Sequence, residues 1–147
     1  MKFTKGYWMN LPGVTNTDAV QVREVKVEND RVYLYTVPYH ADMRAMGGPL
    51  LEMYISSPQP DIIRTEAYHF MGSNQKMPAF ELNDAHCALE VENTETTVTI
   101  KSGNTKLVIG KNPCSFDYYY KDKKLTSIGN RFGNAMISTI STPDGNY

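Results

Sequence analysis

The stretch of residues 62–70 limits the fold more than any other part of the sequence. Ile63, Thr65 and Ala67 fall on one side of an extended chain, and charged or aromatic residues fall on the other. Turn residues flank the stretch on both sides, with prolines before it and a glycine after it. This period of two predicts a strand in an antiparallel sheet, with one face toward a core.

Similar runs, bounded by turn residues, recur along the chain at the spacing of about 8–12 residues that is typical of β-sandwiches. Further strands are expected at residues 20–27, 32–37, 50–56, 86–92, 96–101, 106–109, 115–120, 125–128 and 136–140, with a short edge piece at 78–82. No segment requires a helix. A chain of 147 residues suits one domain. We therefore expect an all-β fold, an antiparallel β-sandwich formed by residues 1–147 as a single domain.

The clearest hairpin is expected around Asn29 and Asp30. Both residues tolerate the positive φ of a two-residue turn. This turn places Val27 opposite Val32 on the paired strands. The apolar side of the first strand changes before Glu24, which predicts a β-bulge there.

Composition excludes several classes of partner. The net charge is −1, and no concentrated cluster of Lys and Arg provides the positive field that a nucleic acid needs. No apolar run reaches the roughly 20 residues of a membrane span, and no signal peptide is visible at the start. We expect no nucleic-acid or membrane partner and a cytoplasmic protein. Cys87 and Cys114 are expected to be buried free thiols.

Residues for catalysis or metal binding are not found in a useful spacing. The three histidines, His40, His69 and His86, have no partner ligands at metal-site spacing, so neither a metal nor another cofactor is expected. Glu90 and Glu92 share one face of a strand, as a pair of glycosidase carboxylates could. A solvated outer face is the simpler interpretation of that pair. No catalytic residue is therefore assigned.

Aromatic residues leave two interpretations open. Trp8, Tyr118 and Tyr120 are candidates for stacking against a sugar ring, since aromatic faces present large apolar planes. Alternatively, Trp8 seals one end of the core, because large aromatic side chains are usually buried.

A resemblance to a known family rests on many short segments in one order: Gly6-Tyr7-Trp8, Pro12-Gly13-Val14, Val22-Arg23-Glu24-Val25, Arg31-Val32-Tyr33-Leu34-Tyr35, Gly48-Pro49-Leu50-Leu51, Ser56-Ser57-Pro58, Ile63-Arg64, His69-Phe70-Met71-Gly72, Pro78-Ala79-Phe80-Glu81-Leu82 and Lys101-Ser102-Gly103-Asn104. Together they resemble the N-terminal β-sandwich domain of glycoside hydrolase family 31, and most closely its bacterial α-xylosidases. The similarity runs over essentially the whole chain. Cys114 departs from it, since relatives tend to carry a large aromatic residue there.

The resemblance implies a galactose-mutarotase-like supersandwich, of which this is the N-terminal part. It also implies a longer parent enzyme with a catalytic (β/α)₈ barrel downstream that carries both catalytic aspartates. The barrel signature of Trp, Asp and Met-Asn-Glu is absent here. The expected function is a non-catalytic domain of a retaining α-glycosidase, which packs on the barrel and shapes the rim of the active site.

Two alternatives belong to other classes. One is a carbohydrate-binding module that uses Trp8 and Tyr118–Tyr120 to bind an α-linked oligosaccharide. The other is a structural domain whose partner is a protein. An open sheet edge would also favour a homo-oligomer, because exposed edges pair with other chains.

Overall fold

The computed structural model describes residues 3–5, 9–38, 51–68, 86–129 and 138–146. Strands form all of the regular structure in this part of the chain, as the alternating pattern predicts. They are β1 Thr4–Lys5, β2 Met9–Asn10, β3 Thr15–Asp18, β4 Gln21–Val27, β5 Arg31–Val37, β6 Leu51–Ser56, β7 Arg64–Tyr68, β8 Glu90–Asn93, β9 Thr97–Ser102, β10 Thr105–Lys111, β11 Cys114–Tyr120, β12 Lys123–Ile128, β13 Ser138–Thr142 and β14 Gly145–Asn146.

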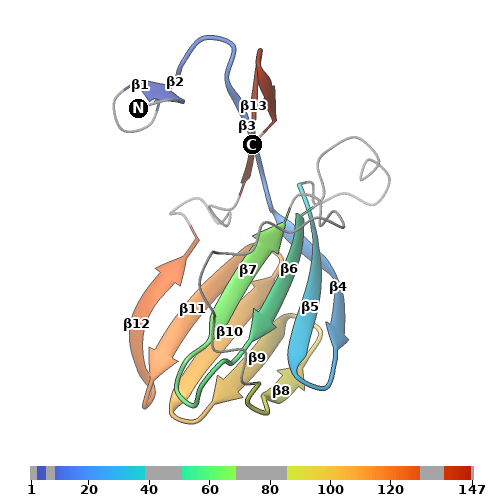
Figure 1. Cartoon of the computed structure of the whole chain (residues 1–147), viewed down its shortest axis with the longest axis vertical. Coiled ribbons are helices and arrows are strands. Elements are labelled where there is room, and N and C mark those ends of the chain that lie inside the picture. Colours follow the sequence, from blue (N-terminus) through green and yellow to red (C-terminus); the bar gives the residue numbers. More distant parts are fainter. Residues whose placement is uncertain (1–2, 6–8, 39–50, 69–85, 130–137, 147) are drawn as a thin grey trace, which may run out of the picture.

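Two antiparallel sheets make up the body of the molecule (Figure 1). One has four strands in the order β4-β5-β6-β7, and the other has five in the order β12-β11-β10-β9-β8. The sheets pack face to face, so the expected β-sandwich is confirmed. Sequential strands are neighbours in both sheets, which is the usual result of short hairpin connections.

Two smaller sheets lie outside the sandwich, and one of them is the pair β1-β2. The other is larger. It has the order β14-β13-β3, and β3 and β13 project from one end of the body in Figure 1. The run at residues 136–140 correctly predicts a strand near β13, but β3 is not predicted. Its sequence, Thr-Asn-Thr-Asp, has no apolar alternation, and its pairing with β13 over a long sequence separation produces the strand.

The hairpin between β4 and β5 has the predicted register. Val27 lies opposite Val32, and the turn closes with the Glu28 amide donating to the Arg31 carbonyl at 2.8 Å. The register shifts between Val22 and Glu24, where the change in the apolar side predicts a bulge. Local sequence therefore determines this part of the sheet.

The strand expected at residues 86–92 begins later than predicted. β8 starts at Glu90, and residues 86–89 belong to no strand. The Cys87 amide donates to the Ser57 carbonyl at 2.8 Å, so this segment is bonded to a turn and not to a sheet ladder.

Apolar side chains from both sheets meet in one core. Its fully buried members are Val32, Leu34, Met53, Ile55, Val98, Ile100, Leu107, Ile109, Cys114 and Phe116. They alternate along β5, β6, β9, β10 and β11 with outward-facing residues, as a period of two requires. Ile63 also packs against this core, as predicted for residues 62–70, whereas Ala67 on the same predicted face is exposed in the edge strand β7.

Specific contacts join the two layers at both ends. The Val20 amide donates to the Val37 carbonyl at 2.9 Å, and the Val20 carbonyl accepts from the Cys114 amide at 2.7 Å. One residue thus connects β5 to β11. Farther along, the hydroxyls of Ser57 and Ser102 lie 2.6 Å apart in the interior.

Candidate functional site

The outer face of the β4–β7 sheet has the most interconnected set of aromatic and charged side chains among the described residues. The strand register brings together Glu24, Lys26, Arg31, Tyr33, Tyr35, Glu52, Tyr54, Arg64, Glu66 and Tyr68. We call this set the tyrosine face. Its members alternate with buried residues such as Leu34, Met53 and Ile55, and therefore point away from the core.

Two rows of this face cross the sheet. In one row Tyr33 lies opposite Tyr54, and Tyr54 lies opposite Glu66. In the next row Tyr35 lies opposite Glu52, and Glu52 lies opposite Tyr68. Directly opposed side chains on a sheet are in contact range, so tyrosine and glutamate side chains of neighbouring strands lie side by side in both rows.

The tyrosine rings contact one another across three strands. The centroids of Tyr33 and Tyr54 are 5.3 Å apart with the planes at 56°, and those of Tyr54 and Tyr68 are 6.0 Å apart at 69°. Tilted and edge-on arrangements are the favoured geometries for aromatic pairs. Tyr54 is the centre of the row because it contacts both neighbours.

Carboxylates accept hydrogen bonds from the two outer tyrosines of this row. The Tyr33 hydroxyl donates to Glu52 at 3.0 Å, and the Tyr68 hydroxyl donates to Glu66 at 3.1 Å. Desolvation, followed by the hydrogen bond to Glu52, raises the pKa of Tyr33 to about 12. The same two causes, with Glu66 as partner, raise the pKa of Tyr68.

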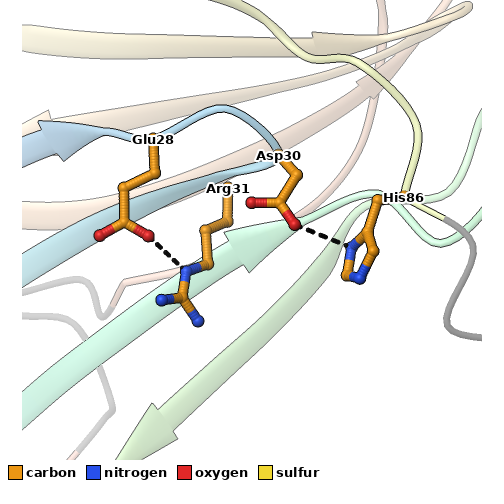
Figure 2. A network of polar contacts seen from close by, with 4 residues as sticks. All are labelled: Glu28, Asp30, Arg31 and His86. Atoms are coloured by element: carbon orange, nitrogen blue, oxygen red, sulfur yellow. Dashed lines mark hydrogen bonds and ion pairs between the residues drawn. The ribbon is translucent and has the colours of Figure 1, made fainter.

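Cations lie over the rings. The Arg31 guanidinium is 4.7 Å from the centroid of Tyr54, and the Lys26 ammonium is 5.2 Å from that of Tyr33. Figure 2 shows how Arg31 is held: its Nε donates to Glu28 at 2.5 Å across the β4–β5 turn. The same turn carries Asp30, whose carboxylate is 3.3 Å from Nδ1 of His86.

Two of the three candidate sugar-stacking residues, Tyr118 and Tyr120, lie in β11. Tyr118 packs against the core, and its hydroxyl lies 2.9 Å from that of Thr65 on the opposite sheet. Tyr120 is 38% exposed at the end of β11, with the Lys121 ammonium 5.5 Å from its ring centroid. Trp8 lies outside the described residues. A role of these three residues in sugar binding stays a prediction.

The thiols differ from each other. Both cysteines are free; Cys114 is buried as expected, whereas Cys87 is only partly buried. Burial raises the pKa of Cys114 to about 12, so this thiol stays protonated at neutral pH and is a poor nucleophile. The expectation that both thiols are buried is therefore wrong for Cys87, because its segment lies outside the strand that was predicted to bury it.

Catalytic groups do not converge in the part of the chain that the structure describes. Glu90 and Glu92 are both exposed on the outer side of the five-stranded sheet, which confirms the interpretation as a solvated face. Across the described ranges, no three His, Cys, Asp or Glu side chains form a group that could hold a metal ion. His40 and His69 fall outside these ranges. Among the same residues, no helix has the length and apolarity to cross a membrane.

Sequence reasoning missed the tyrosine face. Each of its tyrosines occupies an ordinary outward position in its own strand, and Tyr33, Tyr54 and Tyr68 come from three different strands. The signal was present as tyrosine at alternate positions of β5, combined with tyrosine and glutamate in β6 and β7. Only the register aligns these positions.

Three solved structures of proteins from Listeria monocytogenes share this fold. One is a cycloalternan-forming enzyme in complex with a pentasaccharide substrate. The other two are of an uncharacterized protein of strain EGD-e, one of them in complex with glucose, magnesium and calcium. Each aligns with this chain at 16% identity and a TM-score of 0.65.

The alignments cover very different shares of this chain and of the Listeria chains. They cover 94% of this chain but 12% of each Listeria chain. The chain therefore spans about an eighth of the length of the proteins that it matches. The likeness confirms the all-β fold with packed antiparallel sheets. No family model matches the sequence.

Proposed function

We propose that this chain is a non-catalytic β-sandwich domain of a family 31 retaining α-glycosidase of the α-xylosidase type. In this proposal it packs on the catalytic barrel of the same polypeptide and shapes the rim of the active site. The observation that carries the proposal is the alignment of nearly the whole chain with a small part of a cycloalternan-forming enzyme. The order of short segments in the sequence supports the same family.

The properties of the described residues agree with a supporting role. The buried thiol of Cys114 is protonated at neutral pH, and the exposed carboxylates of Glu90 and Glu92 lie on an open sheet face. A glycosidase needs two carboxyl groups on either side of a bound sugar, with one of them held in its protonated form. Glu90 and Glu92 instead lie side by side on one face of β8.

The test compares the chain with a longer polypeptide. The purified chain is incubated with nitrophenyl α-xyloside and nitrophenyl α-glucoside, and no release of nitrophenol above the buffer rate is expected. The reading frame beyond residue 147 is expected to encode the barrel, and the polypeptide that contains both is expected to hydrolyse the xyloside with the higher kcat/KM. Turnover by the chain alone, or a longer product without a barrel, would contradict the proposal.

A second candidate function is carbohydrate binding by the domain itself. It is favoured by the exposed ring of Tyr120 at the end of β11. Calorimetric titration with xylo- and malto-oligosaccharides tests this candidate, because sugar binding at the platform gives a heat that a mutation of the platform removes. If Tyr120 is the platform, Tyr120→Ala abolishes that heat.

A further inference from the structure

We propose that the tyrosine face binds an uncharged oligosaccharide, laid across β5, β6 and β7. This inference rests on the proposed function, because it assigns a sugar contact to a domain of an α-glycosidase. It places that contact on a different sheet from Tyr118 and Tyr120. Three features of the face support it: its aromatic surface, the hydrogen-bonding groups beside that surface, and its charge.

The first feature is the aromatic surface. A pyranose ring presents C–H groups on its faces and hydroxyls at its rim, so it suits an apolar plane bordered by polar groups. Tyr33, Tyr54 and Tyr68 form a continuous row, with centroids separated by 5.3 and 6.0 Å. Lys26 and Arg31 lie over one face of Tyr33 and Tyr54, so a ligand that lies along the row contacts the ring edges and the faces that these cations leave open.

The second feature is the hydrogen-bonding capacity of the side chains beside the rings. An ionised carboxylate has about four acceptor positions. Glu52 uses one for Tyr33, and Glu66 uses one for Tyr68. The remaining positions can accept from sugar hydroxyls, while Arg31 can donate to them. Tyr33 and Tyr68 are already fixed by these hydrogen bonds, so a ligand orders few additional side chains on binding.

The third feature is the charge of the face. Cations and carboxylates alternate along it, as in the pairs Glu24 with Lys26 at 3.1 Å and Glu28 with Arg31 at 2.5 Å. Such a surface lacks the excess positive field that attracts a polyanion. An uncharged ligand rich in hydroxyls complements it better than a nucleic acid or a strongly charged peptide.

The experiment is a titration of the isotopically labelled chain with maltohexaose and xyloglucan-derived oligosaccharides, followed by amide chemical shifts. Saturable shifts are expected at outward residues of β5, β6 and β7. Tyr54→Ala is expected to weaken binding about tenfold or more, because it removes the ring that contacts both others, whereas Tyr54→Phe keeps most of the affinity. Tyr68→Ala, in the edge strand β7, provides a second test if Tyr54→Ala fails to fold.

Tyr119→Ala is the matched control. Tyr119 is a partly buried outward tyrosine on the five-stranded sheet, and the Lys106 ammonium is 5.0 Å from its ring centroid, much as Lys26 lies over Tyr33. Its removal is expected to leave sugar affinity unchanged.

Three results would overturn the inference: no shifts at millimolar sugar, shifts confined to the surroundings of Tyr120, or equal loss of affinity in Tyr119→Ala and Tyr54→Ala. Shifts on this face that only the barrel protein induces would also overturn it, in favour of a protein interface. Nitrophenol release by the chain alone contradicts the proposed function without affecting the titration. An absence of sugar binding together with an absence of turnover contradicts only the inference.

Discussion

Single side chains in this sandwich depend strongly on which sheet face they occupy. Cys114 and Tyr119 lie five positions apart in β11, yet one thiol is fully buried and one phenol points outward. Tyr33 has an aromatic neighbour, a carboxylate and an ammonium around it, all from the outer face. Chemical properties at this scale follow from the period of two and from the facing strand.

The thiol of Cys114 is expected to be unreactive in the folded protein. It is buried, and its pKa of about 12 keeps it protonated at pH 8, whereas Cys87 is partly exposed. Titration with a coloured disulfide reagent should label one thiol per chain quickly and the second only in denaturant. Cys87→Ser should abolish the fast phase. Rapid labelling of both thiols in the native protein would contradict this expectation.

Tyr33 is expected to make stability depend on alkaline pH. Its pKa is higher in the folded state, about 12, than the ordinary value of 10, so folding favours the protonated phenol. The stabilisation is fully present below pH 10 and is lost as the pH rises from 10 to 12. Tyr33→Phe should cost about 1 kcal/mol at pH 8 through the lost hydrogen bond to Glu52, and its stability should then fall less steeply above pH 10.

Urea unfolding at pH 8, 10 and 11 measures this difference. Tyr119→Phe, on the other sheet, controls for the loss of a phenol group as such. Parallel pH dependences for wild type and Tyr33→Phe would refute the assignment.

At the scale of elements, the turn before β7 stabilises the β9–β10 turn through direct hydrogen bonds. Asp61, which ends the proline-rich turn before β7, adopts φ of +67°. Its carboxylate accepts from the Asn104 amide in the β9–β10 turn, and its carbonyl accepts from the Thr105 hydroxyl at 2.7 Å. Gly103 leaves room for this contact, because a methyl group there would overlap the Asp61 carboxylate.

Asp61→Ala is expected to destabilise the domain by about 1–3 kcal/mol, since it leaves the turn amides unpaired and keeps a side chain at positive φ. Asp122→Ala is the matched control: Asp122 also has positive φ, at +62°, in a hairpin turn, but its side chain is 90% exposed. Its salt bridge to Lys106 is solvent-screened, so little change is expected. Thermal or urea unfolding compares the two variants, and equal effects would show that the inter-turn contact contributes nothing.

The whole molecule is stabilised by the single core between its sheets. Phe116 is fully buried among residues of both sheets. Phe116→Ala is expected to cost about 3–5 kcal/mol because it removes a large side chain and leaves a cavity. Leu125, 60% exposed in β12, is the comparison, and Leu125→Ala should change stability by less than about 0.5 kcal/mol. Chemical denaturation gives both values, and a small loss in Phe116→Ala would mean that the sheets do not pack as described.

Self-association is expected of the chain by itself. β12 is the end strand of the five-stranded sheet, and five of its six residues are exposed. An exposed end strand can pair with another copy through its unpaired backbone groups. Light scattering should show a mass that rises with concentration, and Leu125→Lys should reduce the rise. A monomer mass at every concentration would contradict this prediction.

The sequence by itself determined most strands of the two large sheets, their turns and much of the local register. The pairing of Val27 with Val32 and the bulge before Glu24 follow from neighbouring side chains and their turn preferences. These features depend on φ and ψ over a few residues, which local sequence controls.

Only the tertiary structure decided which distant residues meet. Asp61 reaches Asn104 over 43 positions, and Tyr118 reaches Thr65 over 53. The row of Tyr33, Tyr54 and Tyr68 exists because β5, β6 and β7 pair in one register. Each strand alone carries only one or two outward tyrosines. The order and stagger of strands are chosen by burying the common core, and that choice depends on all of the strands together.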